Sequence, residues 1–194
     1  MYYKNVFFDS FKLSIPGIHN VYNALACICV SNEHFINSIH IKSALNKFTG
    51  AHRRFEFKGK INNTVSVYDD YAHHPTEITA TYNSLSNKKY NKSWGIFQPH
   101  TYSRTSNLLD EFADSLKNFD NIILLDVYAA RETNTYNIST LDLYNKLKTL
   151  NSNTYYIPDF NNCIDFIKSN IKDNDIVLTI GAGTVTNIGP MLIN

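Results

Sequence analysis

Short apolar runs alternate with longer amphipathic stretches through most of the chain. The apolar runs, rich in β-branched residues, predict five strands, at residues 64–68, 93–97, 121–126, 154–157 and 176–180. Apolar residues spaced three and four apart predict the intervening helices, at residues 75–86, 104–118, 139–149 and 159–169, with a short helix at the end. Strands that alternate with helices of this length indicate βαβ units. We therefore expect an α/β fold of the Rossmann-like type, a mostly parallel sheet with helices on both faces.

The beginning of the chain follows a different pattern. Partial alternation predicts a strand over residues 4–15, and Asn20, a residue type that caps helices, predicts the start of a first helix. A second helix is expected at residues 38–47. One strand and two helices bury too little apolar surface to fold alone. We therefore expect residues 1–48 to be the end of a larger domain, with exposed apolar faces, and residues 49–194 to form a second domain.

Charge and cysteine usage exclude several classes of protein. The chain has 18 basic and 17 acidic residues and a formal net charge of +1, which gives no excess for binding nucleic acid or an anionic membrane surface. No apolar run approaches the roughly 18 residues that span a bilayer. The three cysteines, Cys27, Cys29 and Cys163, have no metal-binding or disulfide spacing. We expect a cytoplasmic protein that contacts neither nucleic acid nor membrane.

The most concentrated polar stretch is residues 69–77, Asp-Asp-Tyr-Ala-His-His-Pro-Thr-Glu, between a predicted strand and a predicted helix. Pro75 suits the first helical turn. Ligands of open α/β sheets bind at the carboxyl ends of strands, so two carboxylates, two imidazoles and a phenol here predict a site. The alternative is a turn with an Asp cap and two solvated histidines. No protein-ligated metal is expected, because adjacent side chains diverge and no third ligand has a standard spacing.

Three further polar clusters follow strands, at residues 98–105, 126–132 and 181–187. His100 and Arg104 in the first can hold an anionic group. The sequence Gly181-Ala182-Gly183 is similar to a phosphate-binding turn, but Thr186 replaces the third glycine of that fingerprint, so a tight strand-to-helix turn is the alternative. Neither a P-loop nor a G-x-S-x-G nucleophile elbow occurs in the sequence.

Taken together, these stretches resemble the Mur ligase family. The matching segments follow the family's order along nearly the whole chain, at residues 16–24, 53–56, 69–77, 97–105, 126–130 and 181–183. The run from Gln98 to Thr105 fits best the members that join L-alanine to UDP-N-acetylmuramate. Members that recycle a tripeptide onto the same sugar share the Asp-Asp-x-Ala-His-His-Pro stretch, and they remain the alternative. A nucleotide-binding or interaction module without catalysis also remains open, because the chain has no P-loop.

The resemblance implies an ATP-dependent ligase of peptidoglycan precursor synthesis, in which an acyl phosphate forms and an amine then attacks it. It covers the end of a central ATP-binding domain (residues 1–48) and a whole C-terminal domain (residues 49–194). The P-loop, most Mg²⁺ ligands and the domain that binds the UDP sugar have no counterpart here. We therefore expect a truncated or split form that is inactive by itself. A separate N-terminal chain that supplies the missing domains is one alternative, which the sequence leaves open.

The same resemblance implies residues for binding ATP. His19, Asn20 and Asn23 are expected at the adenine end. Arg54 is expected to reach the ATP phosphates and to act in catalysis. Asp70 is expected to hold the nucleotide or the closed hinge, also as part of the catalytic set.

The resemblance implies a second group around the amino acid and the acyl phosphate. Tyr71, His73, His100 and Arg104 are expected there, with His100 and Arg104 in the catalytic set and Arg104 on the alanine carboxylate. The family usually has Arg directly after the motif His, where this chain has Thr101. Loss of one guanidinium from an anion site predicts weaker binding of the amino acid.

Overall fold

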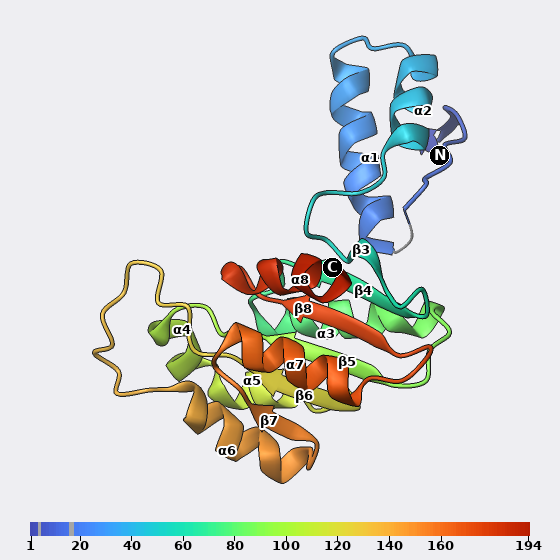
Figure 1. Ribbon diagram of the computed structural model, residues 1–194. Coiled ribbons are helices and arrows are strands. Elements are labelled where there is room, and N and C mark those ends of the chain that lie inside the picture. Colours follow the sequence, from blue (N-terminus) through green and yellow to red (C-terminus); the bar gives the residue numbers. More distant parts are fainter. Residues whose placement is uncertain (4, 16–17) are drawn as a thin grey trace. The chain divides into compact units, whose positions relative to one another are not determined.

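The computed structural model describes residues 1–3, 5–15 and 18–194, and the side chains of Tyr3 and His19 also lie outside this description. The described chain divides into two compact units, residues 1–51 and 52–194 (Figure 1). The assignment of residues 1–48 to a central ATP-binding domain stays a prediction.

Two helices form most of the first unit. α1 (Ile18–Glu33) and α2 (Ser38–Lys47) follow an antiparallel pair of very short strands, β1 (Tyr2–Tyr3) and β2 (Val6–Phe7). The Asn37 side chain accepts a hydrogen bond from the Ile39 N–H at 2.9 Å and so caps the start of α2. The helix expected at residues 38–47 therefore forms with those bounds.

Two predictions for the first unit are wrong. Within the described part of residues 4–15, the expected strand is reduced to β2, which pairs with the two-residue β1 just before it; the sequence there offers partial alternation but no neighbouring strand of useful length. α1 begins at Ile18, so Asn20 lies inside the first turn and is not the cap. Pro16 and Gly17, which follow the expected strand, lie outside the described residues.

The second unit is built on a six-stranded sheet in the order β3-β4-β8-β5-β6-β7. Its strands are β3 (Glu56–Ile61), β4 (Val65–Asp70), β5 (Ser93–Phe97), β6 (Asn121–Leu124), β7 (Thr154–Tyr156) and β8 (Ile176–Ile180). Every neighbouring pair is parallel except β3 and β4. The expected α/β fold with a mostly parallel sheet is therefore confirmed.

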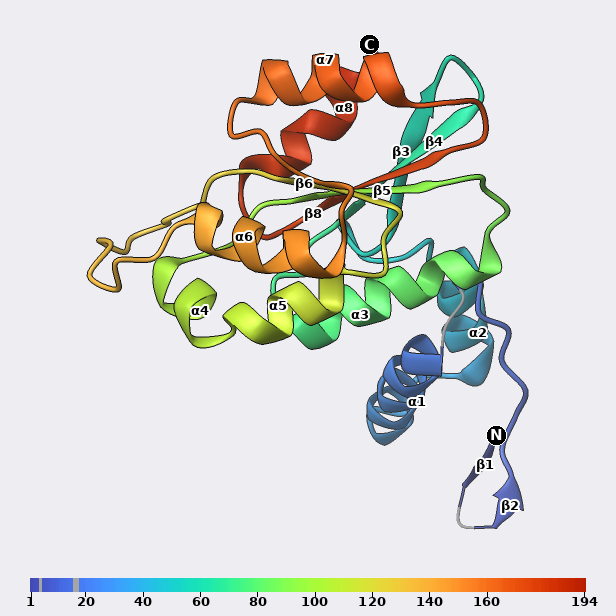
Figure 2. The same cartoon turned by 90° about the horizontal axis from the view of Figure 1, so that it is seen from below.

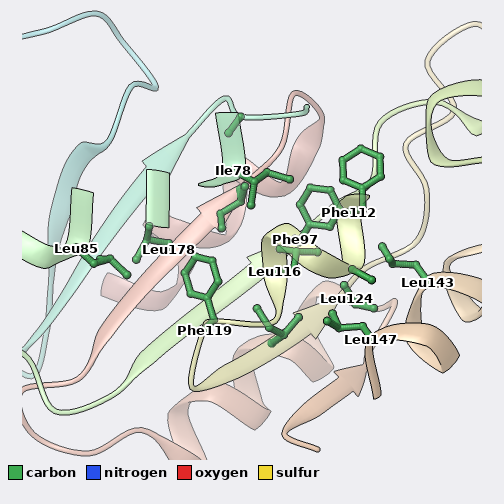
Figure 3. Close-up of a cluster of buried hydrophobic side chains, with 14 of the residues drawn as sticks. Ile78, Leu85, Phe97, Phe112, Leu116, Phe119, Leu124, Leu143, Leu147 and Leu178 are labelled. Atoms are coloured by element: carbon green, nitrogen blue, oxygen red, sulfur yellow. The ribbon is translucent and has the colours of Figure 1, made fainter. Parts of the chain in front are cut away.

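Helices cover both faces of this sheet (Figure 2). One face carries α3 (Pro75–Asn83), α5 (Leu109–Leu116) and α6 (Thr140–Leu150), and the other carries α7 (Phe160–Asn170) and α8 (Ile188–Ile193). The apolar cluster on the first face includes Phe97, Phe112 and Leu124, each at most 1% exposed (Figure 3). A second cluster lies under α7 and α8. None of the helices in the described ranges is long and apolar enough to cross a membrane.

The register of the sheet aligns the carboxyl ends of its parallel strands. Asp70 pairs with Ile180, Ile180 pairs with Phe97, and Phe97 pairs with Leu124. The last strand in the sequence, β8, lies between β4 and β5. The segments that follow β4, β8, β5 and β6 are therefore neighbours at the end of the sheet where these strands finish. We call this end of the sheet the rim.

Two features of the second unit differ from the sequence prediction. β3 was not expected, because Lys58, Gly59 and Lys60 interrupt its apolar pattern, and it forms as an edge strand against β4. The helix expected at residues 104–118 is two helices, α4 (Tyr102–Asn107) and α5, separated at Leu108. The remaining predicted strands and helices form within a few residues of their expected positions.

Candidate functional site

The turn from β4 to α3 is fixed by its own polar residues. Pro75 occupies the first turn of α3, as expected, and His74 is the cap, its Nδ1 accepting from the Thr76 N–H at 3.3 Å. A Glu77 carboxylate oxygen accepts from the N–H groups of His73 (3.0 Å) and His74 (3.2 Å), which completes a capping box. The expected alternative, an Asp cap, is therefore wrong, because the imidazole of His74 fills that role.

Glu77 is also electrostatically tied to the rim. Burial opposes its charge, but the His73 N–H and the nearby positive groups outweigh burial, so the pKa of Glu77 lies below its usual value. Its carboxylate lies 3.4 Å from His73 Nδ1 and 3.7 Å from Arg54 Nη1. His73 is thereby held over the rim by a carboxylate that stays charged at neutral pH.

Four rings line the rim in sequence. The ring centroids of Tyr71 and His73 are 5.3 Å apart, those of His73 and His100 are 5.9 Å apart, and those of His100 and Tyr128 are 5.6 Å apart. They come from the segments after β4, β5 and β6. The structure therefore brings together Tyr71, His73 and His100, which the sequence analysis placed around one substrate.

Arg104 joins this row through His100. Its Nη1 lies 3.3 Å from His100 Nδ1. A guanidinium can only donate, so Nδ1 accepts, and the neutral ring carries its proton on Nε2. Burial, and then the positive charges of Arg104 and His73, lower the pKa of His100. The pair therefore presents a permanent cation beside a neutral imidazole, an arrangement suited to binding a carboxylate or a phosphoryl oxygen.

The segment that leads into α4 is held by the loop after β6. The Thr101 N–H donates to the Tyr128 carbonyl at 2.9 Å, and the Tyr128 N–H donates to the Pro99 carbonyl at 2.8 Å. Thr101 has a φ of +66°, which is uncommon for a β-branched residue. Glu132 accepts from both the N–H (2.9 Å) and the hydroxyl (2.5 Å) of Ser103. These contacts hold the start of the long loop at residues 125–139 against the rim (Figure 1).

Arg53 and Asp69 form a buried ion pair below the rim. Arg53 Nε lies 2.9 Å from Asp69 Oδ2, and the two side chains are 13% and 0% exposed. Asp69 also accepts from the hydroxyls of Thr179 (2.6 Å) and Thr186 (2.9 Å). Every polar group in this network has partners, as a buried charge requires.

Arg53 further connects the rim to the start of the second unit. Its Nη2 donates to the Gly181 carbonyl at 2.5 Å, its guanidinium lies 4.9 Å from the Tyr71 ring centroid, and its carbonyl accepts from the Tyr71 N–H at 2.8 Å. Arg53 therefore fixes Tyr71 and the turn after β8 together. Its neighbour Arg54 has a side chain that is 54% exposed and is available to a ligand.

Asp70 is engaged by the chain itself. Its two oxygens accept from the N–H groups of Ala72 (2.8 Å) and Phe55 (2.9 Å). Burial raises the pKa of Asp70, and these hydrogen bonds only partly oppose it. Asp70 thus ties the segment before β3 to the end of β4. Its expected part in holding the nucleotide stays a prediction.

The two glycines after β8 are explained by close packing. A Cβ on Gly183 would overlap the side-chain oxygen of Gln98, and a Cβ on Gly181, whose φ is +143°, would lie 2.7 Å from the Gln98 carbonyl oxygen. The Gln98 side chain also accepts from the Val185 N–H at 3.0 Å. These contacts support the tight turn over the phosphate turn that the motif resembles.

The nucleotide residues expected from the first unit are less fully described. Asn20 and Asn23 both lie on α1, three positions apart, and Asn23 is exposed. The side chain of His19 lies outside the described residues. Their expected place beside adenine stays a prediction.

Sequence reasoning assigned no contacts to several residues of the rim, although it counted Asp69 among the carboxylates of the predicted site. Arg53, Asp69, Gln98, Tyr128 and Glu132 each connect two of its segments. Four of them lie inside the segments already singled out, and Glu132 ends one of them, but only the order of the strands shows which partner each residue meets. Within the described ranges, no group of three or more His, Cys, Asp or Glu side chains is arranged to hold a metal ion.

Comparison with known proteins identifies the family of the second unit. Residues 53–183 match the family model described as "Mur ligase, glutamate ligase domain". The chain belongs to the Mur ligase family. The matched residues cover nearly all of the second unit, so that unit has the fold of the Mur ligase C-terminal domain.

Individual Mur ligases resemble this chain along most of its length. A UDP-N-acetylmuramate–L-alanine ligase of Lachnospira eligens is 45% identical over 95% of this chain and 40% of its own length. The solved UDP-N-acetylmuramate–alanine ligase of Thermotoga maritima is 28% identical, with a TM-score of 0.76 over 98% of this chain and 40% of that one. The more distant MurF ligase of the same organism, solved with ADP, is 15% identical with a TM-score of 0.65, which shows a shared fold alone. The chain thus spans about 40% of the length of the curated Mur ligases that it matches.

Proposed function

We propose that this chain is the C-terminal part of an ATP-dependent ligase that joins L-alanine to UDP-N-acetylmuramate in the cytoplasm. Two observations support the proposal. The chain is 45% identical, over almost all of its length, to a ligase of that name. The rim also places Arg104 and His100 together at the carboxyl ends of the parallel strands, where ligands of such sheets bind.

In this proposal Arg104 binds the carboxylate of the incoming amino acid. Its guanidinium is always charged and already oriented by His100, so little side-chain freedom is lost on binding. The neutral His100 directs its Nε2–H to an oxygen of the substrate. Tyr71 and His73 complete the wall of the site, and Arg53 holds Tyr71 in place.

Arg54 is the group of this chain that would meet the phosphates of ATP, which supplies the transferred phosphoryl group. Its side chain is largely exposed, whereas Arg53 is committed to Asp69. A preplaced cation stabilises negative charge on the transferring phosphoryl group. The described residues offer no acidic cluster for Mg²⁺, so we place the metal ligands in the part of the ligase that this chain does not include.

The test measures phosphate release from ATP in the presence of UDP-N-acetylmuramate and L-alanine. This chain is assayed alone and mixed with an N-terminal fragment of a related ligase. We expect turnover only in the mixture. Absence of turnover in both, with the chain shown to be folded, contradicts the proposal and favours a non-catalytic module. Turnover with a tripeptide in place of L-alanine favours the tripeptide-recycling ligase.

Variants of the two arginines assign the roles. Arg104→Ala should raise the KM for alanine roughly 10- to 100-fold, because a charged hydrogen-bond partner of the carboxylate is lost. Arg104→Lys, the matched control, keeps the charge and should lose less. Arg54→Ala should lower kcat with little change in the KM for alanine. An unchanged KM for alanine in Arg104→Ala contradicts the assignment of Arg104.

A positive charge added at position 101 tests the same anion site by a gain of binding instead of a loss. The family usually has Arg at this position, so Thr101→Arg should lower the KM for alanine if the site is competent. Thr101→Gln, of similar length and without charge, is the control. A gain that is equal in both variants contradicts an electrostatic role for the position.

A further inference from the structure

A hollow lies at the end of the sheet opposite the rim. It has a volume of about 150 Å³ and is formed where β4 and β8 begin. Its floor is a single rung of the sheet, on which Lys60 pairs with Ser66 and Ser66 pairs with Ile176. Asp70, at the rim, lies four positions after Ser66 along β4, a distance of about 13 Å. The hollow is therefore separate from the candidate site.

Three lysines line this hollow without carboxylate partners. Lys60, Lys88 and Lys89 form no ion pair with any acidic group of the described ranges, whereas Lys58, on the same edge strand as Lys60, pairs with Glu56. Lys88 is held at the wall, with its ammonium 5.2 Å from the Tyr68 ring centroid and 5.9 Å from that of Phe55. The three ammonium groups repel one another, and an anion placed between them relieves that repulsion.

The carboxylates near the hollow are occupied. Asp175 lines it, but its oxygens accept from the Trp94 indole N–H (3.0 Å) and from the N–H groups of Lys172 (3.0 Å) and Lys92 (3.2 Å). Asp173, at the margin, accepts from the Thr64 hydroxyl at 2.9 Å. These two groups reduce the positive potential without neutralising any one lysine.

Neutral hydrogen-bond donors face the same hollow. Within the described ranges, the side chains of Ser66, Tyr90 and Asn174 line it and have no hydrogen-bond partner there. Three charged and three neutral donors around one small space suit an anion with several acceptor oxygens. A volume of about 150 Å³ is below the 300–1,000 Å³ of sites for drug-sized ligands, which favours a small anion.

We propose that this hollow binds a small oxyanion of the phosphate type through Lys60, Lys88 and Lys89. Free inorganic phosphate and the phosphate of a small phosphomonoester share this chemistry. The hollow is on the face of the sheet that carries α3, and it does not depend on the function proposed for the rim.

The test is an NMR titration of the ¹⁵N-labelled 194-residue chain with inorganic phosphate, at an ionic strength kept constant with sodium chloride. We expect saturable amide shifts around the hollow, at Thr64, Ser66, Tyr90 and Asn174. A parallel titration with glycerol phosphate separates the two sources, since a phosphomonoester site should prefer it. Chloride alone should produce no such shifts.

Charge variants identify the lysines. The double variant Lys60→Gln/Lys88→Gln should weaken phosphate binding at least about fivefold, since each exposed charge contributes modestly. The Lys60→Arg/Lys88→Arg variant should retain binding. Lys168→Gln, on α7 over the other face of the sheet, is the matched control and should bind as the parent does. Fluorescence of the single tryptophan, Trp94, checks that each variant is folded.

Three results would overturn the proposal. The first is the absence of saturable shifts. The second is a set of shifts confined to the rim, around His73 and Ser103, which would place the phosphate in the candidate site instead. The third is equal binding by the parent and the double Gln variant, which means an adventitious ion only.

Discussion

The two compact units differ in how much apolar surface each buries. In the described part of the first unit, the buried apolar side chains are Ala24, Ile28 and Ile41, and Phe35 is 96% exposed. The second unit has an apolar cluster on each face of its sheet. Because burial of apolar area is the main favourable term in folding, the second unit has the means to fold by itself and the first has few. That residues 1–48 belong to a larger domain stays a prediction.

The two units also differ in how deeply their charged side chains are buried. The second unit contains buried charges with complete sets of partners, Arg53 and Asp69 above all. An ion pair of the first unit, Lys42 with Asp9, is more exposed, with 41% and 19% of the side chains accessible. Chemistry that needs fixed geometry is therefore found in the unit that has a core to hold it.

The largest effect is expected from removing a core side chain of the second unit. Phe112 is fully buried against Phe97, with ring centroids 5.5 Å apart. Phe112→Ala should lower the free energy of unfolding by about 4 kcal/mol, through lost burial and the cavity left behind. The single tryptophan, Trp94, is buried in this unit, so its fluorescence reports the transition directly.

The matched control is in the first unit. Ile28→Ala removes a buried side chain there and should leave the Trp94 transition unchanged within about 0.5 kcal/mol, because the two units are compact separately. A shift as large as that of Phe112→Ala would mean that the two units unfold together, and the comparison above would then be wrong.

The adjacent arginines should give the next largest difference. Arg53→Ala leaves the fully buried Asp69 without its cation and should cost about 3 kcal/mol of unfolding free energy. Arg54→Ala, the control, removes an exposed side chain 3.7 Å from Glu77 and should change it by less than about 0.5 kcal/mol. Urea denaturation followed by Trp94 fluorescence measures both. Equal effects would show that Arg53 is not a structural anchor.

The smallest effect is a local one that depends on pH. Hydrogen bonds from the Ser103 hydroxyl and N–H lower the pKa of Glu132 below its usual 4.5. The contribution of the ionised Glu132 carboxylate to stability is therefore present above pH 4.5 and is lost as the pH falls through the lowered pKa. The Ser103 amide should titrate in NMR with a midpoint below 4.5, and the titration should be absent in Glu132→Gln. A midpoint at or above 4.5 would contradict the contact.

The pKa of Asp70 is shifted in the opposite direction from that of Glu132, and the same pH titration measures it. Burial raises its pKa above the usual 3.8, so the folded state binds a proton more readily than the unfolded chain does. The contribution of Asp70 to stability is therefore greatest below pH 3.8 and is lost as the pH rises through the raised pKa. The Ala72 amide, which donates to Asp70, should titrate with a midpoint above 3.8. A midpoint below 3.8 would contradict the effect of burial.

Local patterns in the sequence determined the elements of the second unit well. The strands β5 and β8 have the bounds that their apolar runs predict, and Pro75 begins α3 as expected. These features depend on neighbours in the sequence, namely apolar periodicity and proline geometry. The same local reasoning failed for residues 4–15, where alternation had no partner strand, and for β3, whose charged residues are tolerated only because it is an edge strand.

The residues of the rim could be predicted from the sequence, but the contacts between them could not. The sequence by itself determined that Tyr71, His73, His100 and Arg104 follow strands, and the resemblance gave them expected roles. Only the tertiary structure decided that β8, the last strand, lies between β4 and β5. Pairing between parallel strands far apart in sequence leaves no local signal, because it depends on the packing of the whole sheet. That insertion sets the turn after β8 against Gln98 and Asp69. It also provides the Gly181 carbonyl that holds Arg53 beneath the rim, whereas the side chain of Arg54 is left largely exposed.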